Sequence, residues 1–373
     1  MNKTMPIIYI VSFLAVCWAP LFTMALGINP THYEKRALAQ RPSLITEDGL
    51  NLDFPHQFNT YFSDNFGLRP YYVTAYTALV YCLLNDSVNE QVIVGKDGWL
   101  FFGPTLKDFT ATDVLTDQEI DRIIEMLSLQ DKYLASLGIE FIFAVVPNKS
   151  SIYGEYMPSR YPERLQQNNC CNLFRALENT TINSVDLFDP LKNAKSKQQV
   201  YHTLDTHWNN IGALVAARTI LRQMQESMPD YSFKSYTDAQ FNIEKRWLGD
   251  LSLILLPAFK CKDFQAVYEI PENYTFQENG RQLRLTRNLE AMRIETTSQA
   301  NNTSLLMFRD SFANALVPFI SNNFGYVYYT CTLPYSYATI ETLSPDVVIL
   351  EIAERNIPNL LKYAPVMPIP ACP

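Results

Sequence analysis

The chain has 373 residues, of which 47% are hydrophobic and 18% charged, so a packed core is expected and wholesale disorder is excluded. The formal net charge is −8 and Lys and Arg form no cluster, which argues against nucleic-acid binding because phosphate contacts need concentrated basic charge. Four histidines and the lack of a C-x-x-C pair make a zinc site improbable, and we predict neither a metal nor a cofactor.

The first 27 residues have the character of a signal anchor. Residues 6–27 carry no charge, and a length of about 20 apolar residues matches the hydrocarbon core of a bilayer. No clear A-x-A-like cleavage site precedes Gly27, which favours an uncleaved anchor over a cleaved signal peptide. Basic residues follow the segment at 35, 36 and 41 and weaken the positive-inside argument. A single N-terminal anchor before all the globular mass is nevertheless typical of an exported protein.

Seven cysteines agree with export to an oxidising compartment. Cys17 lies in the anchor, and the other six are an even number that disulfides could pair. Their connectivity is not readable from the sequence, because six cysteines allow many pairings.

Residues 28–90 are expected to form a membrane-proximal helical and linker region. Phenylalanines at 54, 58, 62 and 66 recur every four residues, which indicates one apolar face of a helix. Residues 71–85 form a strongly apolar helix candidate. This candidate is too short to span a membrane comfortably, so we expect it to pack against the folded domain.

Residues 91–373 are predicted to form one α/β domain. Residues 92–102 are typical of a hairpin with its turn at 96–98, and Thr116 with Glu119 predicts a capping box before a helix at 120–137. Strand candidates at 139–146, 183–188, 305–308, 325–330 and 346–352 alternate with helices, which predicts a mostly parallel sheet covered on both faces. Residues 229–300 mix aromatic and polar residues and indicate an insertion or a substrate-facing subdomain with short antiparallel strands.

Ser311 stands where a buried strand candidate gives way to a helix candidate. The apolar run 305–308 stops at Arg309-Asp310-Ser311, and ligands of α/β sheets bind outside the carboxyl ends of strands. The unpaired N–H groups of a helix start suit a developing oxyanion. Ser311 is therefore a candidate nucleophile, although Ser311 or Asp310 could equally be a plain helix cap.

A serine nucleophile needs a base, and histidine oriented by a carboxylate is the usual one. His32 and His56 fall in the membrane-proximal region, which leaves His202 and His207. Asp205 lies two residues before His207, and this spacing puts both side chains on one side of an extended segment. Most Asp-x-His pairs are structural, but the joint occurrence with Ser311 favours Asp205 and His207. His202 stays open as the alternative base.

Five short segments, in this order along the chain, carry a family resemblance. They are residues 96–102 (KDGWLFF), 146–149 (VPNK), 205–208 (DTHW), 308–312 (FRDSF) and 350–355 (LEIAER). Over roughly residues 30–365 the chain resembles the alginate O-acetyltransferases related to AlgJ and AlgX, within the SGNH (GDSL-like) hydrolase group. The resemblance implies a flavodoxin-like three-layer α/β/α sandwich and a triad of Asp205, His207 and Ser311. The sequence ends soon after the last strand candidate, so we expect it to lack the separate carbohydrate-binding module found in some members, which favours the membrane-anchored single-domain type.

The function implied is an exported O-acetyltransferase, periplasmic and anchored to the bacterial inner membrane. It would move acetyl groups onto hydroxyls of a polysaccharide through an acetyl-Ser311 intermediate, with a multi-spanning membrane acetyltransferase as the donor partner. Two alternatives stay open: a carbohydrate acetylesterase with the same triad, and a non-catalytic polymer-binding scaffold of an exopolysaccharide export complex.

Further site residues are weaker candidates. Asn148, in the loop after a strand candidate, could be a second oxyanion donor or a residue that fixes a turn. Arg309 and Arg355 could meet an acidic sugar, or they could buttress the site through Glu351 or Glu354.

Overall fold

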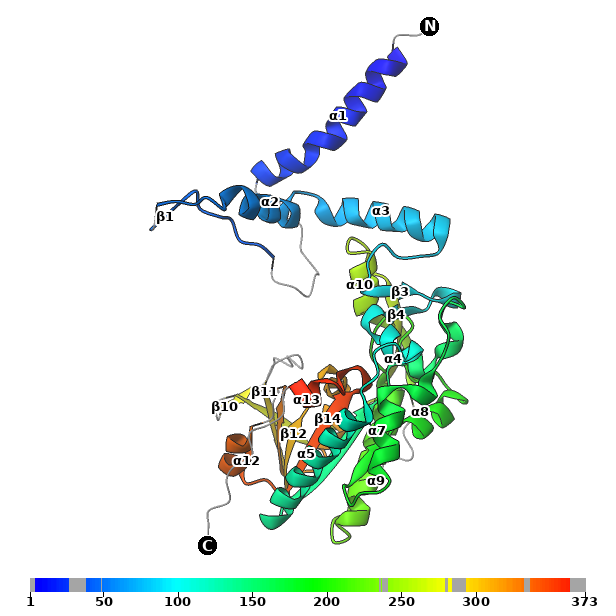
Figure 1. Cartoon of the computed structure of the whole chain (residues 1–373), viewed down its shortest axis with the longest axis vertical. Coiled ribbons are helices and arrows are strands. Elements are labelled where there is room, and N and C mark those ends of the chain that lie inside the picture. The colour runs from blue at the N-terminus through cyan, green and yellow to red at the C-terminus, as the bar shows by residue number, and fades with distance from the viewer. Residues whose placement is uncertain are drawn as a thin grey trace.

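The computed structural model describes residues 4–26, 38–47, 49–234, 236, 241–278, 281–283, 293–331 and 336–362. Three helices precede the folded domain, namely α1 (Thr4–Ala25), α2 (Phe54–Asn65) and α3 (Arg69–Leu84), and Figure 1 shows α2 and α3 between α1 and the domain. The short strands β1 (Ile45–Thr46) and β2 (Gly49–Leu50) form a hairpin before α2. Residues 35 and 36 and Cys372, which entered the arguments above, lie outside the described residues.

The domain is built on an eight-stranded mixed sheet in the order β10-β9-β11-β13-β12-β14-β5-β6. The strands from β13 to β6 are parallel, as expected, and β11, β9 and β10 extend the sheet in antiparallel fashion beyond β13. Their bounds are β5 (Glu140–Val146), β6 (Ser184–Asp186), β9 (Tyr274–Glu278), β10 (Arg281–Leu283), β11 (Arg293–Ser298), β12 (Ser304–Phe308), β13 (Tyr326–Thr330) and β14 (Val347–Ala353).

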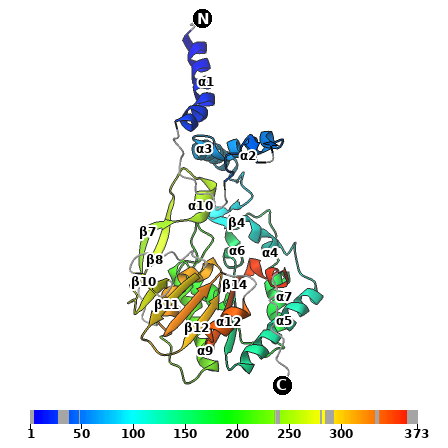
Figure 2. The same cartoon turned by 90° about the vertical axis from the view of Figure 1, so that its left-hand side faces the viewer.

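Helices pack on both faces of this sheet (Figure 2). They are α4 (Leu106–Thr110), α5 (Asp117–Ser136), α6 (Lys149–Ile152), α7 (Asn169–Leu177), α8 (Phe188–Lys195), α9 (Asn210–Ser227), α11 (Val317–Ser321), α12 (Tyr337–Leu343) and α13 (Asn359–Lys362). Helix α10 (Asp250–Leu255) instead packs against Val92, Val94 and Leu100. In β5 the alternate residues Ile142, Ala144 and Val146 pack with α8, α9 and α11. Their neighbours Phe141 and Phe143 pack with α5, α7, α12 and α13. A strand buried on both faces needs apolar residues throughout, which explains the continuous apolar runs in the sequence.

Several local predictions are confirmed. Strands β3 (Val92–Val94) and β4 (Leu100–Phe102) pair as a hairpin, whose turn has Gly98 in the left-handed region at φ 77°. The capping box at the start of α5 is complete, with Thr116 and Glu119 each accepting from the other's backbone N–H. The mixed sheet with its helices is as expected, whereas the detailed flavodoxin-like arrangement stays a prediction.

The region 229–300 divides into two parts. Strands β7 (Asn242–Leu248) and β8 (Lys262–Val267) form a separate antiparallel ribbon with α10 between them. Strands β9 to β11 instead lengthen the central sheet, because β11 pairs with the edge of β13. The assignment of residues 229–300 as an insertion or a substrate-facing subdomain stays a prediction.

The N-terminal helices leave much of their apolar surface exposed. Within the described residues, α1 is the one helix that is long and apolar enough to cross a membrane, and none of its apolar stretch is buried. Helix α3 forms as predicted and contacts the domain, because Tyr81 packs against the cluster of Val92, Leu100 and Leu251 and Thr74 accepts a hydrogen bond from the Ala258 N–H. Other large side chains of α3, namely Tyr76, Leu79 and Leu83, are exposed.

No disulfide joins the six cysteines that the structure describes, which are Cys17, Cys82, Cys170, Cys171, Cys261 and Cys331. Cys17 and Cys82 are exposed on α1 and α3, and Cys170 is buried in α7. The disulfides that the sequence would allow are therefore not formed among these six residues.

Candidate active site

Ser311 lies at the turn that follows β12. The 3₁₀-helix η5 (Ser311–Ala315) begins there, and the Asp310 side chain accepts a hydrogen bond from the Phe312 N–H at 2.9 Å. Of the two residues that the sequence allowed as the helix cap, Asp310 and not Ser311 is therefore the cap of η5. Because capping falls to Asp310, the exposed Ser311 hydroxyl is left for other contacts.

Asp310 also fixes the position of this turn. Its Oδ2 accepts hydrogen bonds from the Ala353 N–H at 2.7 Å and from Asn356 Nδ2 at 3.1 Å, and its own N–H donates to Glu351 Oε2 at 2.9 Å. Burial raises the pKa of Glu351 well above its usual range, and the charge of Asp310 adds to the rise. The carboxyl ends of β12 and β14 are thereby joined behind Ser311.

The second part of the site is the loop that carries Asp205 and His207. Tyr201 and Trp208 pair across its base, and Asn209 caps α9 by accepting from the Ile211 and Gly212 N–H groups. The cap by Asn209 holds the loop at the start of α9. The Trp208 indole donates to the Phe312 carbonyl at 3.1 Å, which ties the loop to η5.

The structure brings Asp205, His207 and Ser311 into one hydrogen-bonded chain. His207 Nδ1 lies 2.7 Å from Asp205 Oδ1, and His207 Nε2 lies 2.8 Å from Ser311 Oγ, across 104 residues of sequence. A carboxylate only accepts, so Nδ1 carries the proton and Nε2 is left to accept from the Ser311 hydroxyl. This arrangement can remove a proton from the serine as it attacks an acyl carbon.

Asp205 is held as an anion by its surroundings. Burial alone would raise its pKa, but the hydrogen bond and charge of His207 outweigh burial and hold the pKa of Asp205 well below its usual range. Its second oxygen accepts from Trp247 Nε1 at 3.0 Å and from the Asp250 N–H at 2.9 Å. These two donors come from β7 and α10, which lie within residues 229–300.

Lys149 is a buried residue that sequence reasoning missed. Its Nζ donates to the carbonyls of His202 at 3.1 Å, Thr203 at 3.1 Å and Asp205 at 2.6 Å. Burial lowers the pKa of Lys149 to about 8, although nearby aspartates such as Asp205 oppose this shift. The lysine holds the backbone of the loop, and the sequence signals for it were its place directly after a strand end and its position in the segment 146–149.

The alternative base, His202, does not reach Ser311. The side chain is buried, its Nδ1 lies 2.9 Å from the Phe264 carbonyl, and its ring stacks on Trp247 at 5.0 Å. Burial lowers the pKa of His202, which favours its neutral form. Since Trp247 also donates to Asp205, His202 supports the loop from behind.

Asn148 is not brought to Ser311 either. The residue is fully buried, its Nδ2 donates to Asp108 Oδ2 at 3.0 Å, and its N–H donates to Glu354 Oε2 at 2.7 Å. Burial raises the pKa of Glu354 to about 8 and that of Asp108 to about 6. The turn-fixing alternative describes Asn148 better than the oxyanion alternative, because the side chain is fully buried and bonded to Asp108.

Arg309 supports the turn around Ser311 from inside the protein. It is buried, and its Nη1 donates to Asn314 Oδ1 and to the Asp310 carbonyl. Arg355 lies over the Phe312 ring at 5.2 Å. Of the two roles left open for Arg309, buttressing fits the buried position, whereas direct contact with a sugar does not.

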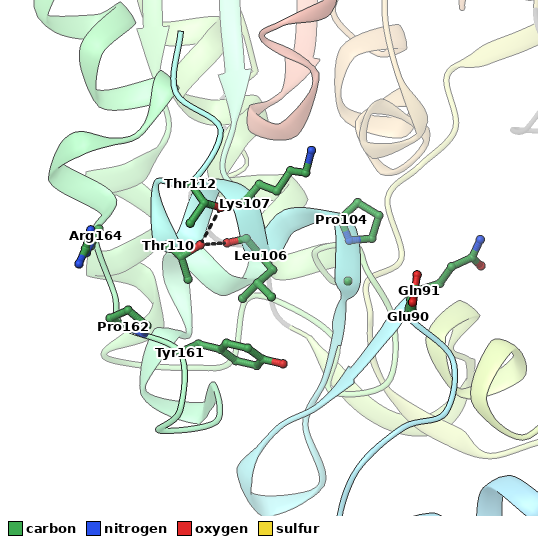
Figure 3. A pocket seen from close by; sticks show the side chains of 11 residues that line it. Glu90, Gln91, Pro104, Leu106, Lys107, Thr110, Thr112, Tyr161, Pro162 and Arg164 are labelled. Atoms are coloured by element: carbon green, nitrogen blue, oxygen red, sulfur yellow. Dashed lines mark hydrogen bonds between the residues drawn. The ribbon is translucent and has the colours of Figure 1, made fainter.

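A groove of about 640 Å³ opens onto His207 and Ser311, within the range usual for small-molecule sites. The β7–β8 ribbon, α10 and α11 form its walls. The lining includes Arg246, Trp247, Val267, Tyr268, Glu272, Asn314, Pro318 and Phe319. A second hollow of about 690 Å³, beside Pro104, Leu106 and Tyr161, holds none of the three candidate catalytic residues (Figure 3).

Asp205, His207 and Asp250 also have the composition of a metal site, with ligand atoms within 4.8 Å of one another. Both ring nitrogens of His207 already make hydrogen bonds in this arrangement. Asp250 Oδ1 accepts from the Thr206 N–H at 2.8 Å and from its hydroxyl at 3.2 Å. Hydrogen bonding accounts for the closeness of these three groups.

The family model of the SGNH hydrolase-like domain of the acetyltransferase AlgX matches residues 92–284, just over half of the chain. The chain belongs to this family. The segment matched to the AlgX family contains Asp205 and His207 but ends before Ser311, so the assignment of the serine depends on the geometry.

Relatives of this AlgX-family chain carry related names. The probable alginate O-acetylase AlgJ of Pseudomonas syringae is 26% identical over 229 residues, covering 61% of this chain and 55% of that protein. The protein of the same name from Pseudomonas aeruginosa is 26% identical over 178 residues, covering 48% of this chain and 44% of that protein. The chain thus matches about half the length of these relatives.

Two solved structures show the same fold at low identity. A DHHW family protein from Eubacterium siraeum aligns with a TM-score of 0.54 and 15% identity, over 76% of this chain and 99% of its own. Bacillus cereus PatB1 aligns with a TM-score of 0.55 and 18% identity, over 71% of this chain and 96% of its own. Together with the AlgX family match, these alignments support an SGNH-like fold.

Proposed function

We propose that this chain is an O-acetyltransferase that moves acetyl groups onto hydroxyls of an extracytoplasmic polysaccharide, anchored to the bacterial inner membrane by α1. The observation that carries the proposal is the unbroken hydrogen-bonded chain from Asp205 through His207 to Ser311, at the mouth of a groove large enough for sugar residues. Membership of the AlgX family and the alginate O-acetylase names of its relatives support the acetyl chemistry.

The reaction has two acyl-transfer steps. In the first, His207 Nε2 takes the proton of Ser311 as Oγ bonds to the acetyl carbon, and His207 then returns that proton to the leaving group. In the second, His207 takes a proton from a sugar hydroxyl, whose oxygen attacks the acetyl-serine and releases Ser311, which regains its proton. Asp205 stabilises the positive charge that His207 carries between these transfers.

Two groups suit the oxyanion that forms in each step. The Ser311 N–H stands at the start of η5, where a helix has no internal acceptor for it. Asn314 is three residues further on, and side chains three apart share one face of a 3₁₀-helix. Arg309 donates to Asn314 Oδ1 and therefore leaves the amide NH₂ to act as the second donor. Asn314 takes the role first considered for Asn148.

The exchange of Asn314 for Ala is expected to lower kcat by about 10²- to 10³-fold, the usual loss for one oxyanion donor. The acetylation rate with a saturating donor would be measured beside that of Asn322→Ala, a neighbouring asparagine outside the groove lining. An Asn314→Ala variant with the kcat of the parent chain would rule out this role.

Acetyl would reach Ser311 from a multi-spanning membrane acetyltransferase, which we propose as the donor partner. An esterase with the same triad is the second candidate, because Ser311 is exposed and water can reach the acetyl-serine. The two functions differ in which hydroxyl attacks the intermediate.

A donor-and-acceptor assay separates these functions. The full chain, purified in detergent, is given a small acetyl ester with and without oligosaccharide, and acetate and acetylated sugar are quantified. We expect acetylated sugar, together with a decrease in free acetate when the acceptor is added. Acetate release that ignores the acceptor would identify an esterase. Absence of any turnover and of acetyl-Ser311 would favour the non-catalytic scaffold.

A further inference from the structure

Helix α3 buries small side chains and exposes large apolar ones. Pro70, Thr74 and Thr77 are buried at spacings of three and four residues, and Thr74 Oγ1 accepts from the Ala258 N–H of the domain at 2.9 Å. The opposite face carries exposed, mostly large apolar side chains, which are Tyr71, Ala75, Tyr76, Leu79, Cys82 and Leu83. A helix on a water-facing surface has the reverse pattern. The outward face of α3 therefore suits apolar surroundings.

The sequence of α3 agrees with a place at a membrane surface. No charged residue occurs between Arg69 and Asp86, although Leu83 is 72% exposed and Tyr76 is 60% exposed. Tyrosine side chains prefer the boundary between lipid and water, because each ring has an apolar body and a polar tip. The helix has 16 residues, shorter than the ~20 that a span requires. Such a helix suits a position along the interface.

Two contacts, at Tyr72 and at Gly67, connect the α3 segment to α1, and we call them the joint. Pro20 lies inside α1 and has no N–H, so the Val16 carbonyl lacks its usual helical donor. The Tyr72 hydroxyl of α3 donates to that carbonyl at 2.7 Å. Just before α3, a Cβ on Gly67 would lie 2.0 Å from Thr23 Oγ1, so glycine permits the close approach of the two segments.

The joint sets the direction of α3. In Figure 1, α3 runs at a wide angle to α1 and lies between α1 and the domain, and Figure 2 shows it at the same level. If α1 crosses a bilayer, α3 lies along the surface of that bilayer on the side of the domain, with its exposed apolar face available to lipid.

We propose that the outward face of α3 is embedded in the lipid surface and forms a second membrane attachment. This inference depends on the proposed anchor and not on the proposed acetyl chemistry. The lipid is favoured over a protein groove because the face continues from α1, carries no charge and has tyrosines near its start.

The attachment would place the candidate active site close to the membrane. Ala258, which bonds to Thr74, follows α10, and Asp250 at the other end of α10 donates its N–H to Asp205. Helix α10 has six residues and is about 9 Å long. The groove would thus be held within a short distance of the surface from which an acetyl donor arrives.

Native Cys82 provides the test, because its thiol is exposed on the outward face of α3. The full chain is reconstituted in vesicles of phosphatidylethanolamine and phosphatidylglycerol under reducing conditions and treated with a membrane-impermeant maleimide. Labelled peptides are quantified by mass spectrometry. We expect Cys82 to react at least about tenfold more slowly than an exposed thiol, because thiolate formation is suppressed in apolar surroundings. The reference thiol is Lys197→Cys, on an exposed site of the domain.

Cys17 in α1 separates this inference from the anchor itself. Protection of both Cys17 and Cys82 supports the lipid attachment. Protection of Cys17 with full labelling of Cys82 overturns the attachment and leaves the anchor intact, and labelling of both overturns the two together. Protection of Cys82 that appears only after another membrane protein is added would replace lipid with a protein partner. The Leu79→Lys/Leu83→Lys variant is expected to regain labelling at Cys82.

Discussion

The exchange of Ser311 for Ala is expected to reduce acetyl transfer by at least about 10⁴-fold, because it removes the hydroxyl on which the proposed acetyl intermediate forms. The variant should fold, since the Ser311 side chain is exposed and, within the part of the chain that the structure describes, its hydroxyl bonds only to His207. Acetylated oligosaccharide and the acetyl-enzyme, detected by mass spectrometry of the intact chain, are the two measurements.

A matched control for this change is Ser196→Ala, which removes a surface hydroxyl that bonds the Asn193 carbonyl far from the groove. Its activity should equal that of the parent chain. A fluorophosphonate probe should label the parent chain and Ser196→Ala but not Ser311→Ala. Persistent labelling or acetyl transfer in the Ser311 variant would show that another nucleophile is used.

The exchange of Asp205 for Asn is expected to lower kcat by about 10³- to 10⁴-fold. The amide NH₂ must face either His207 or the donors from Trp247 and Asp250, because the native carboxylate accepts on both sides. The first orientation reverses the His207 tautomer and the second opposes two donors. We therefore also expect a loss of about 2 kcal/mol in the free energy of unfolding, measured by denaturant titration.

Asp263→Asn is the control that separates loop support from chemistry. Asp263 is buried and accepts from the Leu204 N–H of the same loop at 2.6 Å, yet it makes no contact with His207. This variant should lose stability while keeping most of its kcat. Equal losses of kcat in the two variants would mean that Asp205 acts only as a loop support.

The candidate site shows where sequence reasoning succeeds and where it stops. Ser311 and the pair of Asp205 and His207 were identified because each is a local pattern: a residue after an apolar run, and a spacing of two. Lys149, Trp247 and Asp250 were missed because their contacts to the loop cross about 40 to 60 residues, and no spacing marks them.

Two further details also depend on packing. Asn148 follows a strand end as Ser311 does, but the packing of the β5 loop gives its amide to Asp108. Helix α3 was expected to pack against the domain because it is too short to span a membrane, and it does so through Thr74 and Tyr81, yet its other face is exposed. Composition reveals how apolar a helix is, whereas only packing reveals which side of it meets the protein.

Sequence patterns alone were enough to predict the apolar α1, the alternation of strands and helices, and the candidate residues Asp205, His207 and Ser311. These features follow from the spacing of hydrophobic residues along the chain and from the chemistry of single side chains, and both are local properties. The tertiary structure alone decided that His207, and not His202, meets Ser311, and that the β7–β8 ribbon walls the groove. Those outcomes depend on the order of the strands and on packing, which bring together groups about a hundred residues apart.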